Sequence, residues 1–530
     1  MKTSHLIVNT LLKAGIDKIF SLSGNQIMPV YDAVIDKKID IIHCRHEAAA
    51  VFMADGYAQT SGKIGIALVT AAPGFTNALG PLYAIKANQS PILLLSGDSP
   101  LSQDGLMAFQ ELNQHEIIRE LVKKSTKINQ LNEIENNIYE AIDLARSGRP
   151  GPVHLSLPFD ILNETISKNN TSISTKDKKT DPQLASSTLK KINDIINSSE
   201  TPLVITGPSL SEARNKILYQ KLNKFIKVPI INMSSPRGSN DPSLGNLKTI
   251  LTEADLIITI NKDIDFTLGY GSKERVSSDK FIFVDYENGP INHAKKILKE
   301  RLLLEVRANP SQILSKLADM NFLNDYTTWI NRIKFLSTQR PEKPKSINKI
   351  TPYELCNSVV SEAENFSNVI YISDGGEFGQ WAQSIIPKSK AITNGPSGAI
   401  GGSIPQAIGA SFANPDAIVV CFLGDGTAGF QIADWETARR YKLPIIYIIG
   451  NDHRWGAEVE IQIKDYGEDR AKYCMLDEET NYANVASGLG CKGFKVSSIK
   501  ELKKIIKAVF SSKETTIIDV NIEGLPGPTL

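Results

Sequence analysis

The sequence predicts an α/β protein built from three doubly wound parallel-sheet domains. Three observations lead to this prediction: the length of 530 residues, two polar segments that divide the chain, and short apolar runs that alternate with helical patterns. Such a length suits about three domains of roughly 150 residues each. Near-continuous apolar runs joined by helices are typical of parallel sheets that are covered on both faces. Each piece of the chain is therefore expected to form one such sheet.

The composition is that of an ordinary globular protein. Lys plus Arg number 59 and Asp plus Glu 58, which leaves a net charge of +1, and 41% of the residues are hydrophobic. This balance gives no electrostatic reason to expect a nucleic acid or an acidic membrane surface as a partner. The cysteines form no CxxC pair, which argues against a disulfide framework or a zinc site. Because no signal-peptide pattern and no membrane-spanning run is present, a cytoplasmic location is expected.

Two polar segments are expected to link the domains. Residues 163–183 are rich in Ser, Thr, Asn and Lys, and residues 336–352 combine prolines with several charges. Such segments have little apolar surface to bury. They divide the chain into 1–165, 184–335 and 350–530.

The apolar runs predict the strands of each domain in turn. The expected strands are 39–43, 64–70 and 91–97 in the first domain, 201–207, 254–260 and 280–285 in the central domain, and 368–374, 417–425 and 444–452 in the third domain. Helical patterns lie between them, for example at 46–62 and at 428–442. This alternation is what a strand–helix–strand architecture requires.

A single carboxylate stands at the end of one expected strand. Asp425 lies between two glycines, and Asp452 follows the next strand, 27 residues later. A strand–helix–strand unit of that length brings both strand ends to the same edge of a sheet, where ligands bind. Two carboxylates at one point repel each other unless a cation lies between them, and oxygen ligands suit Mg²⁺ or Ca²⁺. Bare glycine turns next to a helix start also suit a phosphate, whereas the simpler alternative is an ordinary turn.

These residues resemble the thiamin diphosphate (ThDP) motif. In that family an Asp in a GDG turn, a side chain at the next strand end and a main-chain carbonyl two residues further hold the metal. The resemblance assigns these roles to Asp425, Asp452 and the carbonyl of Arg454. Relatives usually carry Asn where this chain has Asp452. Beside Asp425, the residues Gly424, Gly426 and Thr427 are expected to bind the cofactor.

A second motif lies in the first domain. Residues 45–59 read RHEAAAVFMADGYAQ and resemble the ThDP-family pattern H-E-x-x-A-x-x-x-A-x-G-Y-A, which assigns the catalytic carboxyl group to Glu47. In that family this group is hydrogen-bonded to N1′ of the aminopyrimidine ring and activates the cofactor. Alone, Glu47 would be interpreted as a first-turn glutamate that the helix dipole favours. Two motifs in the expected order indicate a ThDP enzyme, and the resemblance covers essentially the whole chain.

Further segments resemble other parts of ThDP enzymes. Residues 70–98 resemble the rest of the pyrimidine-binding domain, residues 395–410 the segment between the two cofactor rings, and residues 373–383 the loop near the diphosphate. The resemblance assigns cofactor contacts to the carbonyl of Gly398, to Ile400 as the apolar wedge between the rings, and to Gly376, Glu377 and Phe378 near the diphosphate. For Ile400 the alternative is ordinary core packing.

The branch of the family is indicated by two segments near the N-terminus. Residues 108–114 (AFQELNQ) resemble the A-F-Q-E segment of acetolactate synthase large subunits, which would place Gln110 and its neighbours above the reacting carbon. Residues 20–34 resemble another loop of these synthases, in which Asn25 and Gln26 replace small residues. Either residue would hold a substrate carbonyl or hydroxyl, or would be a solvated loop residue.

The expected activity is acetolactate synthase-like decarboxylation and carboligation of a 2-oxo acid. The synthase pattern after the metal loop is replaced here by Ala457, Glu458 and Ile461, which puts pyruvate in doubt as the natural substrate. A 2-hydroxyacyl-CoA lyase or oxalyl-CoA decarboxylase-like lyase is one alternative, and a non-catalytic ThDP-fold subunit is another. The synthases hold FAD in the central domain. Residues 201–211 and 283–289 show no clear dinucleotide fingerprint, so FAD stays an open alternative here.

The resemblance also implies an assembly. In this fold Glu47 and Asp425 of one active site belong to different subunits, because the cofactor bridges the first domain of one chain and the third domain of another. The chain is therefore expected to form a homodimer, or a homotetramer built as a dimer of dimers.

Overall fold

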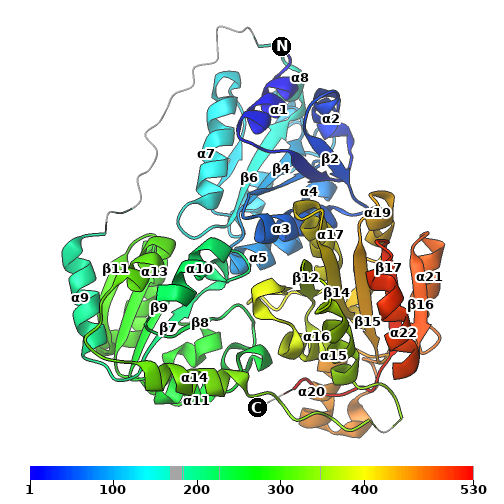
Figure 1. Cartoon of the computed structure of the whole chain (residues 1–530). Helices are drawn as coiled ribbons and strands as arrows, with labels where there is room; N and C mark the ends of the chain where they lie inside the picture. The colour runs from blue at the N-terminus through cyan, green and yellow to red at the C-terminus, as the bar shows by residue number, and fades with distance from the viewer. Residues whose placement is uncertain (167–181, 183, 226, 347, 529–530) are drawn as a thin grey trace.

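The computed structural model consists of three parallel sheets with helices on both faces, and it describes residues 1–166, 182, 184–225, 227–346 and 348–528 (Figure 1). This confirms the predicted class of three parallel-sheet α/β domains. Most of the first expected linker, 163–183, lies outside the described residues. No helix in the described part of the chain combines the length and the apolar character needed to cross a membrane.

The first sheet contains six parallel strands in the order β2-β1-β3-β4-β6-β5. Its strands are β1 (Lys18–Ser21), β2 (Asp40–His43), β3 (Gly65–Val69), β4 (Ile92–Asp98), β5 (Ser125–Lys127) and β6 (Pro152–Pro158). Its helices are α1 (Thr3–Lys13), α2 (Met28–Val34), α3 (Glu47–Ser61), α4 (Pro73–Asn77), α5 (Leu79–Asn88), α6 (Gln114–Ile117), α7 (Ile134–Arg146) and α8 (Phe159–Asn163). The three strands and the helix expected here correspond to β2, β3, β4 and α3.

The central sheet contains five parallel strands in the order β11-β10-β9-β7-β8. Its strands are β7 (Pro202–Thr206), β8 (Ile230–Asn232), β9 (Leu256–Ile260), β10 (Phe281–Asp285) and β11 (Leu302–Arg307). Its helices are α9 (Ser186–Asn197), α10 (Lys216–Phe225), α11 (Leu247–Glu253), α12 (Asn288–Leu298), α13 (Pro310–Asp319) and α14 (Thr327–Thr338). The expected strands correspond to β7, β9 and β10.

The third sheet contains six parallel strands in the order β13-β12-β14-β15-β17-β16. Its strands are β12 (Val369–Ser373), β13 (Ala391–Thr393), β14 (Ile418–Gly424), β15 (Ile445–Asn451), β16 (Lys492–Val496) and β17 (Thr516–Asn521). Its helices are α15 (Pro352–Ala363), α16 (Gly376–Ile385), α17 (Ser403–Ala413), α18 (Asp425–Ala428), α19 (Asp434–Arg440), α20 (Gly456–Tyr466), α21 (Tyr482–Gly488) and α22 (Ile499–Phe510). The expected strands correspond to β12, β14 and β15. The helical pattern at 428–442 is not one helix, because a turn separates α18 from α19.

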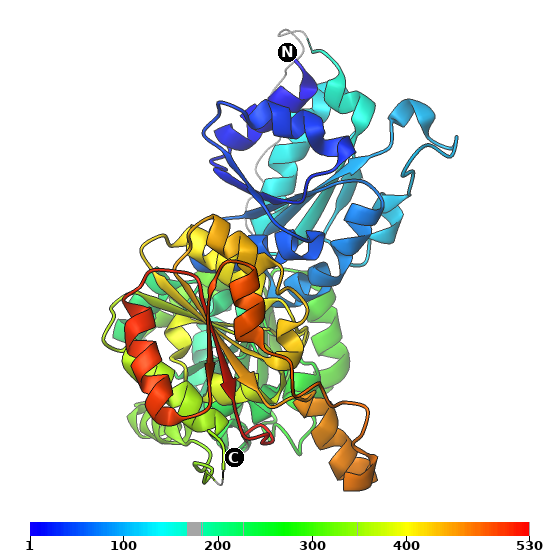
Figure 2. The same cartoon turned by 90° about the vertical axis from the view of Figure 1, so that its right-hand side faces the viewer.

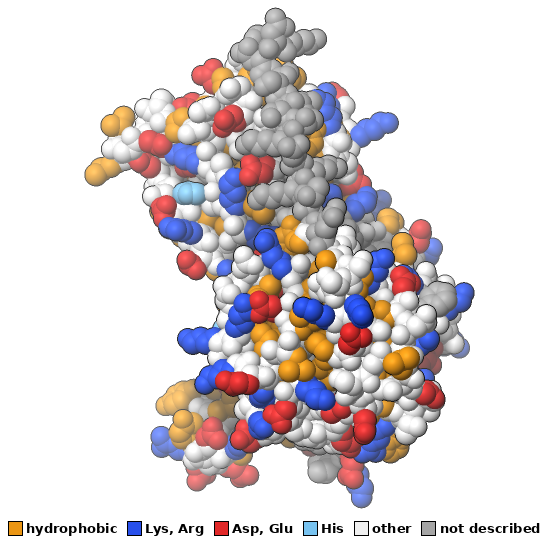
Figure 3. All heavy atoms as spheres, turned by 90° about the vertical axis from the view of Figure 1, so that its left-hand side faces the viewer, with side chains coloured by type: hydrophobic (Ala, Val, Ile, Leu, Met, Phe, Trp, Pro, Cys, Tyr) orange, Lys and Arg blue, Asp and Glu red, His pale blue; other side chains and the backbone are white. Residues whose placement is uncertain are grey.

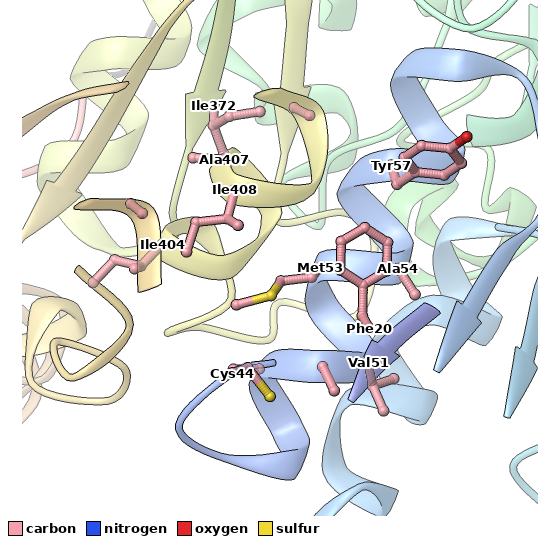
Figure 4. Close-up of a cluster of buried hydrophobic side chains, with 14 of the residues drawn as sticks. Phe20, Cys44, Val51, Met53, Ala54, Tyr57, Ile372, Ile404, Ala407 and Ile408 are labelled. Atoms are coloured by element: carbon pink, nitrogen blue, oxygen red, sulfur yellow. The ribbon is translucent and has the colours of Figure 1, made fainter. Parts of the chain in front are cut away.

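The first and third domains share one apolar core. Helices α3 and α17 lie against each other, and Met53 from the first domain points toward Ile404 and Ile408 from the third, while Ala54 and Tyr57 lie beside Phe20 (Figure 4). The two helices approach closely at Gly409, where an added Cβ would overlap the main-chain oxygen of Met53. This packing fixes the orientation of the two domains within one chain.

The carboxyl ends of the strands hold the polar residues that the sequence singled out. In the third sheet Asp425 follows β14 and Asp452 follows β15, and these two strands pair in parallel with Gly424 opposite Gly450. In the first sheet Glu47 follows β2, and Gln26 follows β1. Parallel sheets bring successive strand ends to one edge, so each set is held at a ligand-binding edge of its sheet.

Candidate functional site

A cavity of about 350 Å³ lies at the carboxyl ends of β12, β14 and β15. It brings together most of the residues expected in the third domain. Those that line it are Gly376, Glu377, Phe378, Gly398, Ile400, Gly424, Asp425, Gly426, Thr427, Asp452 and Arg454. Its size falls in the range of small-molecule sites, which is about 300–1,000 Å³.

Asp425 and Asp452 form a buried pair of like charges in this cavity. Asp425 is only 2% exposed. Burial, and after it the charge of Asp452, raise the pKa of Asp425 to about 8. Burial also raises the pKa of Asp452, and Arg454 opposes that effect. Two buried carboxylates whose charges repel each other are stabilised by a bound cation. Oxygen ligands suit a hard ion such as Mg²⁺.

The donor set for such an ion is small. Within the described residues, no group of three or more His, Cys, Asp and Glu side chains has an arrangement that would hold a metal. A cation between Asp425 and Asp452 would therefore need main-chain oxygens and oxygens of a ligand as well. Mg²⁺ commonly binds in this way, through one or two carboxylates together with substrate phosphates.

The side chain of Arg454 accompanies Asp452. Its Nε donates to Oδ2 of Asp452 at 2.8 Å, and its Nη2 lies 3.1 Å from Oε1 of Glu460. The sequence analysis had assigned a role only to the carbonyl of Arg454. The guanidinium group adds a positive charge beside the carboxylate that replaces the usual amide.

Helix starts and a glycine turn form the part of the cavity that suits a phosphate. The first residues of α16 and of α20 line it, together with the turn at Gly426. Backbone N–H groups at helix starts point outward and favour anions. An added Cβ on Gly426 would lie 3.1 Å from the ring of Trp455, so the close approach of this ring favours glycine there.

A buried aspartate holds the turn that carries Gly398 and Ile400. Oδ1 of Asp374 accepts from the N–H of Gly375 at 2.7 Å and of Gly401 at 3.1 Å, and Oδ2 accepts from the N–H of Ser403 at 3.3 Å. Asp374 is 1% exposed, and burial raises its pKa although these hydrogen bonds oppose the shift. Asp374 therefore positions the turn without lining the cavity itself.

The structure adds residues that the sequence analysis missed. Ser235, Pro236 and Arg237 reach the cavity from the central domain, and Arg237 lies 3.8 Å from Glu377. The hydroxyl of Tyr482 donates to the main-chain oxygen of Asp425 at 2.9 Å. None of these residues belongs to a short motif. Ser235, Pro236 and Arg237 meet the cavity through domain packing, and Tyr482 contacts Asp425 from a later helix of the same domain, so no local signal marks them.

Glu47 lies in a second polar group, at the edge of the first sheet. It is 8% exposed, and its Oε2 accepts from Nδ2 of Asn77 at 3.0 Å. Gln26 is buried nearby, where its Oε1 accepts from Thr70 Oγ1 at 2.8 Å, whereas Asn25 is exposed. This group is built from the ends of β1, β2 and β3.

The two polar groups do not share a cavity within one chain. No described residue of the first domain lines the cavity around Asp425, so Glu47, Asn25 and Gln26 stay apart from it. Gln110 is also absent from that lining. Its neighbour Phe109 is 72% exposed, on a loop that Glu111 ties by accepting from the N–H of Ala108 at 2.9 Å.

The edge of the central sheet where a nucleotide would be expected is filled. The strand order reverses between β7 and β9, which is the usual binding crevice of such sheets. The side chain of Gln89 from the first domain occupies it: Oε1 accepts from Asn261 Nδ2 and from Ser209 Oγ, each at 2.7 Å. Nε2 of Gln89 donates to the main-chain oxygen of Asn261 at 3.2 Å.

A second side chain of the first domain fills the next crevice, between β9 and β10. Nη1 of Arg149 lies 2.7 Å from Asp263 Oδ2, and Nη2 lies 2.6 Å from Asp285 Oδ2. Asp285 is fully buried. The two crevices therefore serve as a contact between domains, and their residues do not fit a dinucleotide.

Comparison with known proteins matches both ends of the chain to one family. Residues 1–117 match the model of the thiamine pyrophosphate enzyme N-terminal TPP binding domain, and residues 374–520 match that of the C-terminal TPP binding domain. The chain is 28% identical to a probable acetolactate synthase large subunit of Methanocaldococcus jannaschii, over 99% of this chain and 92% of that protein. It is 28% identical to the acetolactate synthase large subunit of Lactococcus lactis, over 98% and 92%.

The structure is also similar to a solved one. A thiamine diphosphate-dependent 4-hydroxybenzoylformate decarboxylase of Rhodococcus jostii RHA1 superposes with a TM-score of 0.84, over 99% of this chain and 100% of that chain. The two sequences are 21% identical, so this likeness shows a shared fold.

Proposed function

Because this chain belongs to the thiamine pyrophosphate (ThDP) enzymes, we propose that it is a ThDP- and Mg²⁺-dependent decarboxylase and carboligase that acts on a 2-oxo acid, like the acetolactate synthases. The observation that carries this proposal is the buried pair Asp425 and Asp452 in a cavity lined by a glycine turn and helix starts. Such a site suits a divalent cation bound to a diphosphate. The likeness to synthase large subunits over nearly the whole chain supports the substrate class.

The proposal gives each cavity residue a task. Asp425, Asp452 and the carbonyl of Arg454 hold the metal. Gly376, Glu377, Phe378, Gly424, Gly426 and Thr427 contact the diphosphate half of the cofactor, and Gly398 and Ile400 contact the ring half. The first domain is taken as 1–165, the central domain as 184–335 and the third as 350–530.

The cofactor supplies a nucleophilic carbon and an electron sink for breaking the bond next to a carbonyl. The protein provides position, charge and proton transfer. Glu47 holds a proton at its carboxyl group for the cofactor ring, and Asn77 orients that group through its 3.0 Å hydrogen bond. Asp374 keeps the 398–403 turn in shape through main-chain hydrogen bonds. Gln26, held by Thr70, the exposed Asn25 and the half-buried Gln110 contact the substrate.

A complete site needs a second copy of the chain. Glu47 and Asp425 line different surfaces of one chain, so a cofactor bound at Asp425 would reach only the Glu47 of a partner. Large apolar side chains are exposed on two segments. The loop that carries Gln110 exposes Leu106 (71%), Met107 (96%) and Phe109 (72%). The segment that follows α20 exposes Tyr473 (93%), and α20 itself stands away from the rest of the third domain (Figure 2). Exposed apolar groups of this kind mark interaction surfaces. We therefore propose that the chain forms a homodimer, or a homotetramer built as a dimer of dimers.

The partners of the site are small molecules. The face in Figure 3 mixes Lys and Arg with Asp and Glu and has no broad patch of one sign. This agrees with the net charge of +1 and gives no support for a nucleic-acid partner. FAD is not included among the proposed cofactors, because Gln89 and Arg149 fill the crevices where it would be expected.

The test is an activity assay of the purified protein with ThDP and Mg²⁺. We expect consumption of a 2-oxo acid and release of CO₂, with loss of both after removal of the metal. Pyruvate should be compared with bulkier 2-oxo acids, because Ala457 and Glu458 line the cavity where the synthases differ. Formation of a hydroxylated 2-oxo acid product indicates carboligation, and an aldehyde indicates decarboxylation alone. Cleavage of a 2-hydroxyacyl-CoA without turnover of any 2-oxo acid would overturn the proposal.

A further inference from the structure

A second cavity, of about 420 Å³, lies where the three domains meet. Asn88 lines it from the first domain, Arg214 from the central domain, Arg340 from the segment that follows the central domain, and Lys388 from the third domain. It is a neighbour of the cavity around Asp425, because Ser235 and Gln383 belong to both walls. Its volume suits a small metabolite, and junctions between domains are frequent ligand sites. None of the residues assigned to the cofactor lines it.

Two cations line this cavity near enough for their charges to interact. Lys388 and Arg340 make no ion pair with any described residue, and Arg340 Nη1 donates only to the main-chain oxygens of Ser337 at 2.7 Å and Gln339 at 2.8 Å. Asp241 is the carboxylate whose charge acts on both Lys388 and Arg340. Its Oδ1 already accepts a hydrogen bond from the N–H of Ser243 at 2.9 Å. One carboxylate thus faces two cations.

The electrostatics of Lys388 agree with this excess of positive charge. Lys388 and Arg340 are both exposed at the rim of the cavity. The atoms packed around Lys388 lower its pKa, Asp241 opposes that shift and the charge of Arg340 adds to it. Asp55, behind Gln59, balances Arg214, so the uncompensated positive charge is local to Lys388 and Arg340, which face Asp241 alone. An anion bound beside Lys388 and Arg340 would balance it.

The wall from the first domain offers an amide without a partner. Asn88 is 2% exposed, and neither its Oδ1 nor its Nδ2 has a hydrogen-bond partner among the described residues. Buried amides normally have such partners, so this wall lacks a group that both donates and accepts. Arg214 fixes the position of Asn88, since its Nη1 donates to the main-chain oxygen of Asn88 at 2.7 Å. The charge of Arg214 is balanced at a distance by Asp55, through Gln59.

We propose that this cavity binds a small metabolite that carries an oxyanion, a phosphate or a carboxylate, and a second polar group. The oxyanion lies between Lys388 and Arg340, and the hydroxyl or carbonyl of the ligand pairs with the amide of Asn88. Because all three domains contribute to the wall, the occupied cavity ties them together. This site is distinct from the cofactor site, and its existence does not depend on the proposed reaction.

The experiment uses the full-length protein saturated with ThDP and Mg²⁺, so that the probes do not enter the diphosphate half of the other cavity. Inorganic phosphate and malonate are titrated separately at constant ionic strength while thermal unfolding is followed. A ligand that binds only the folded protein raises Tm in a saturable way. We expect such a rise for at least one probe. Phosphate alone would indicate a phosphorylated metabolite, and malonate alone a carboxylate.

Lys388→Gln is the decisive variant. Because the side chain of Lys388 is exposed at the cavity wall, the substitution removes one charge without leaving a void in the core. Loss of a charge-assisted hydrogen bond should weaken probe binding by about tenfold or more. Lys216→Gln is the matched control: Lys216 begins α10 near Arg214 but does not line this cavity, so parental binding is expected. A second readout is the reaction of Lys388 with an amine-specific reagent, which the probe should slow.

The proposal is overturned if neither probe gives a saturable response, or if Lys388→Gln responds like the parent. It is also overturned if the control loses binding to the same extent, because the effect would then be one of overall charge. A protein that binds a probe here but turns over no 2-oxo acid would contradict only the proposed function.

Discussion

Arg454 donates from Nε to Oδ2 of Asp452 at 2.8 Å, and both side chains are largely enclosed, at 12% and 13% exposed. Relatives usually have a neutral amide at the position of Asp452. By itself this replacement would make the metal site more negative by one charge. The guanidinium group two residues later supplies a compensating charge, which it shares with Glu460.

The first prediction separates the two residues of this pair. Arg454→Met should weaken ThDP binding about tenfold at low Mg²⁺, because it leaves the charge of Asp452 without its partner next to an anionic cofactor. Asp452→Asn should keep activity, since an amide oxygen also serves as a ligand. The double variant should bind ThDP better than Arg454→Met alone. Calorimetry across a magnesium titration measures all three, and additive effects would show that the pair is not coupled.

Asp425 is predicted to matter more than Asp452. Asp425→Ala should lower ThDP affinity by about 100-fold, or ~2.7 kcal/mol, because it removes the buried anionic ligand that no side chain replaces. Asp452→Ala should cost less, since Arg454 is freed at the same time. If Asp425→Ala binds ThDP with the parental affinity and the parental dependence on Mg²⁺, Asp425 is not a metal ligand and serves only in the turn.

Glu47 is predicted to act in proton transfer and not in cofactor binding. Glu47→Gln keeps the shape and the contact with Asn77 but cannot share a proton, so turnover should fall by roughly 10²–10⁴-fold while ThDP stays bound. Steady-state rates and cofactor titration give the two quantities separately. Parental rates in this variant would remove Glu47 from the mechanism.

Asn25 and Gln26 are predicted to tune the choice of substrate. Asn25 is exposed, whereas Gln26 is buried and its Oε1 accepts from Thr70 Oγ1 at 2.8 Å, so replacing Gln26 also removes one hydrogen bond of the sheet edge. Replacing them by Gly and Ala should change the ratio of kcat/KM among 2-oxo acids by about tenfold and leave ThDP affinity near the parental value. The opposite outcome, weaker cofactor with the same substrate profile, would refute this assignment.

The contact between the first and central domains is predicted to depend on pH through Asp263. Burial raises the pKa of Asp263, but the charge and hydrogen bonds of Arg149 outweigh it and hold the pKa below its ordinary value of 3.8. A depressed pKa stabilises the folded state above the ordinary value and loses that effect as pH falls below it. Arg149→Met should therefore lower Tm clearly at pH 7, where it leaves Asp285 as a buried unpaired charge.

The comparison of Tm at two pH values checks this sign. The difference between the parent and Arg149→Met should shrink as the pH drops from 7 towards 3. Arg146→Met, in the last turn of α7, is a suitable control because Arg146 takes no part in this contact. A difference that stays constant over this range would show that the pair contributes packing only.

Much of the molecule followed from local patterns in the sequence. The nine expected strands lie within observed ones to within a few residues, because near-continuous apolar runs between helices have few other solutions. The sequence also predicted that Asp425 and Asp452 lie at the same edge of one sheet, from the spacing of their strands. Two strands joined by one helix run parallel, and their ends must then meet at one edge.

Only the tertiary structure decided which distant groups meet those residues. Arg237 lines the cavity and Tyr482 holds the main chain of Asp425. Gln89 and Arg149 fill the central crevices, and Glu47 stays apart from the cavity around Asp425 within one chain. Apart from that of Tyr482, which lies within the third domain, these contacts join segments 114 to 172 residues apart. They depend on how whole domains are oriented by packing such as that of α3 on α17. Periodicity and spacing describe a segment and its neighbours in the sheet. They carry no information on the angle between two domains, which the shared apolar core sets.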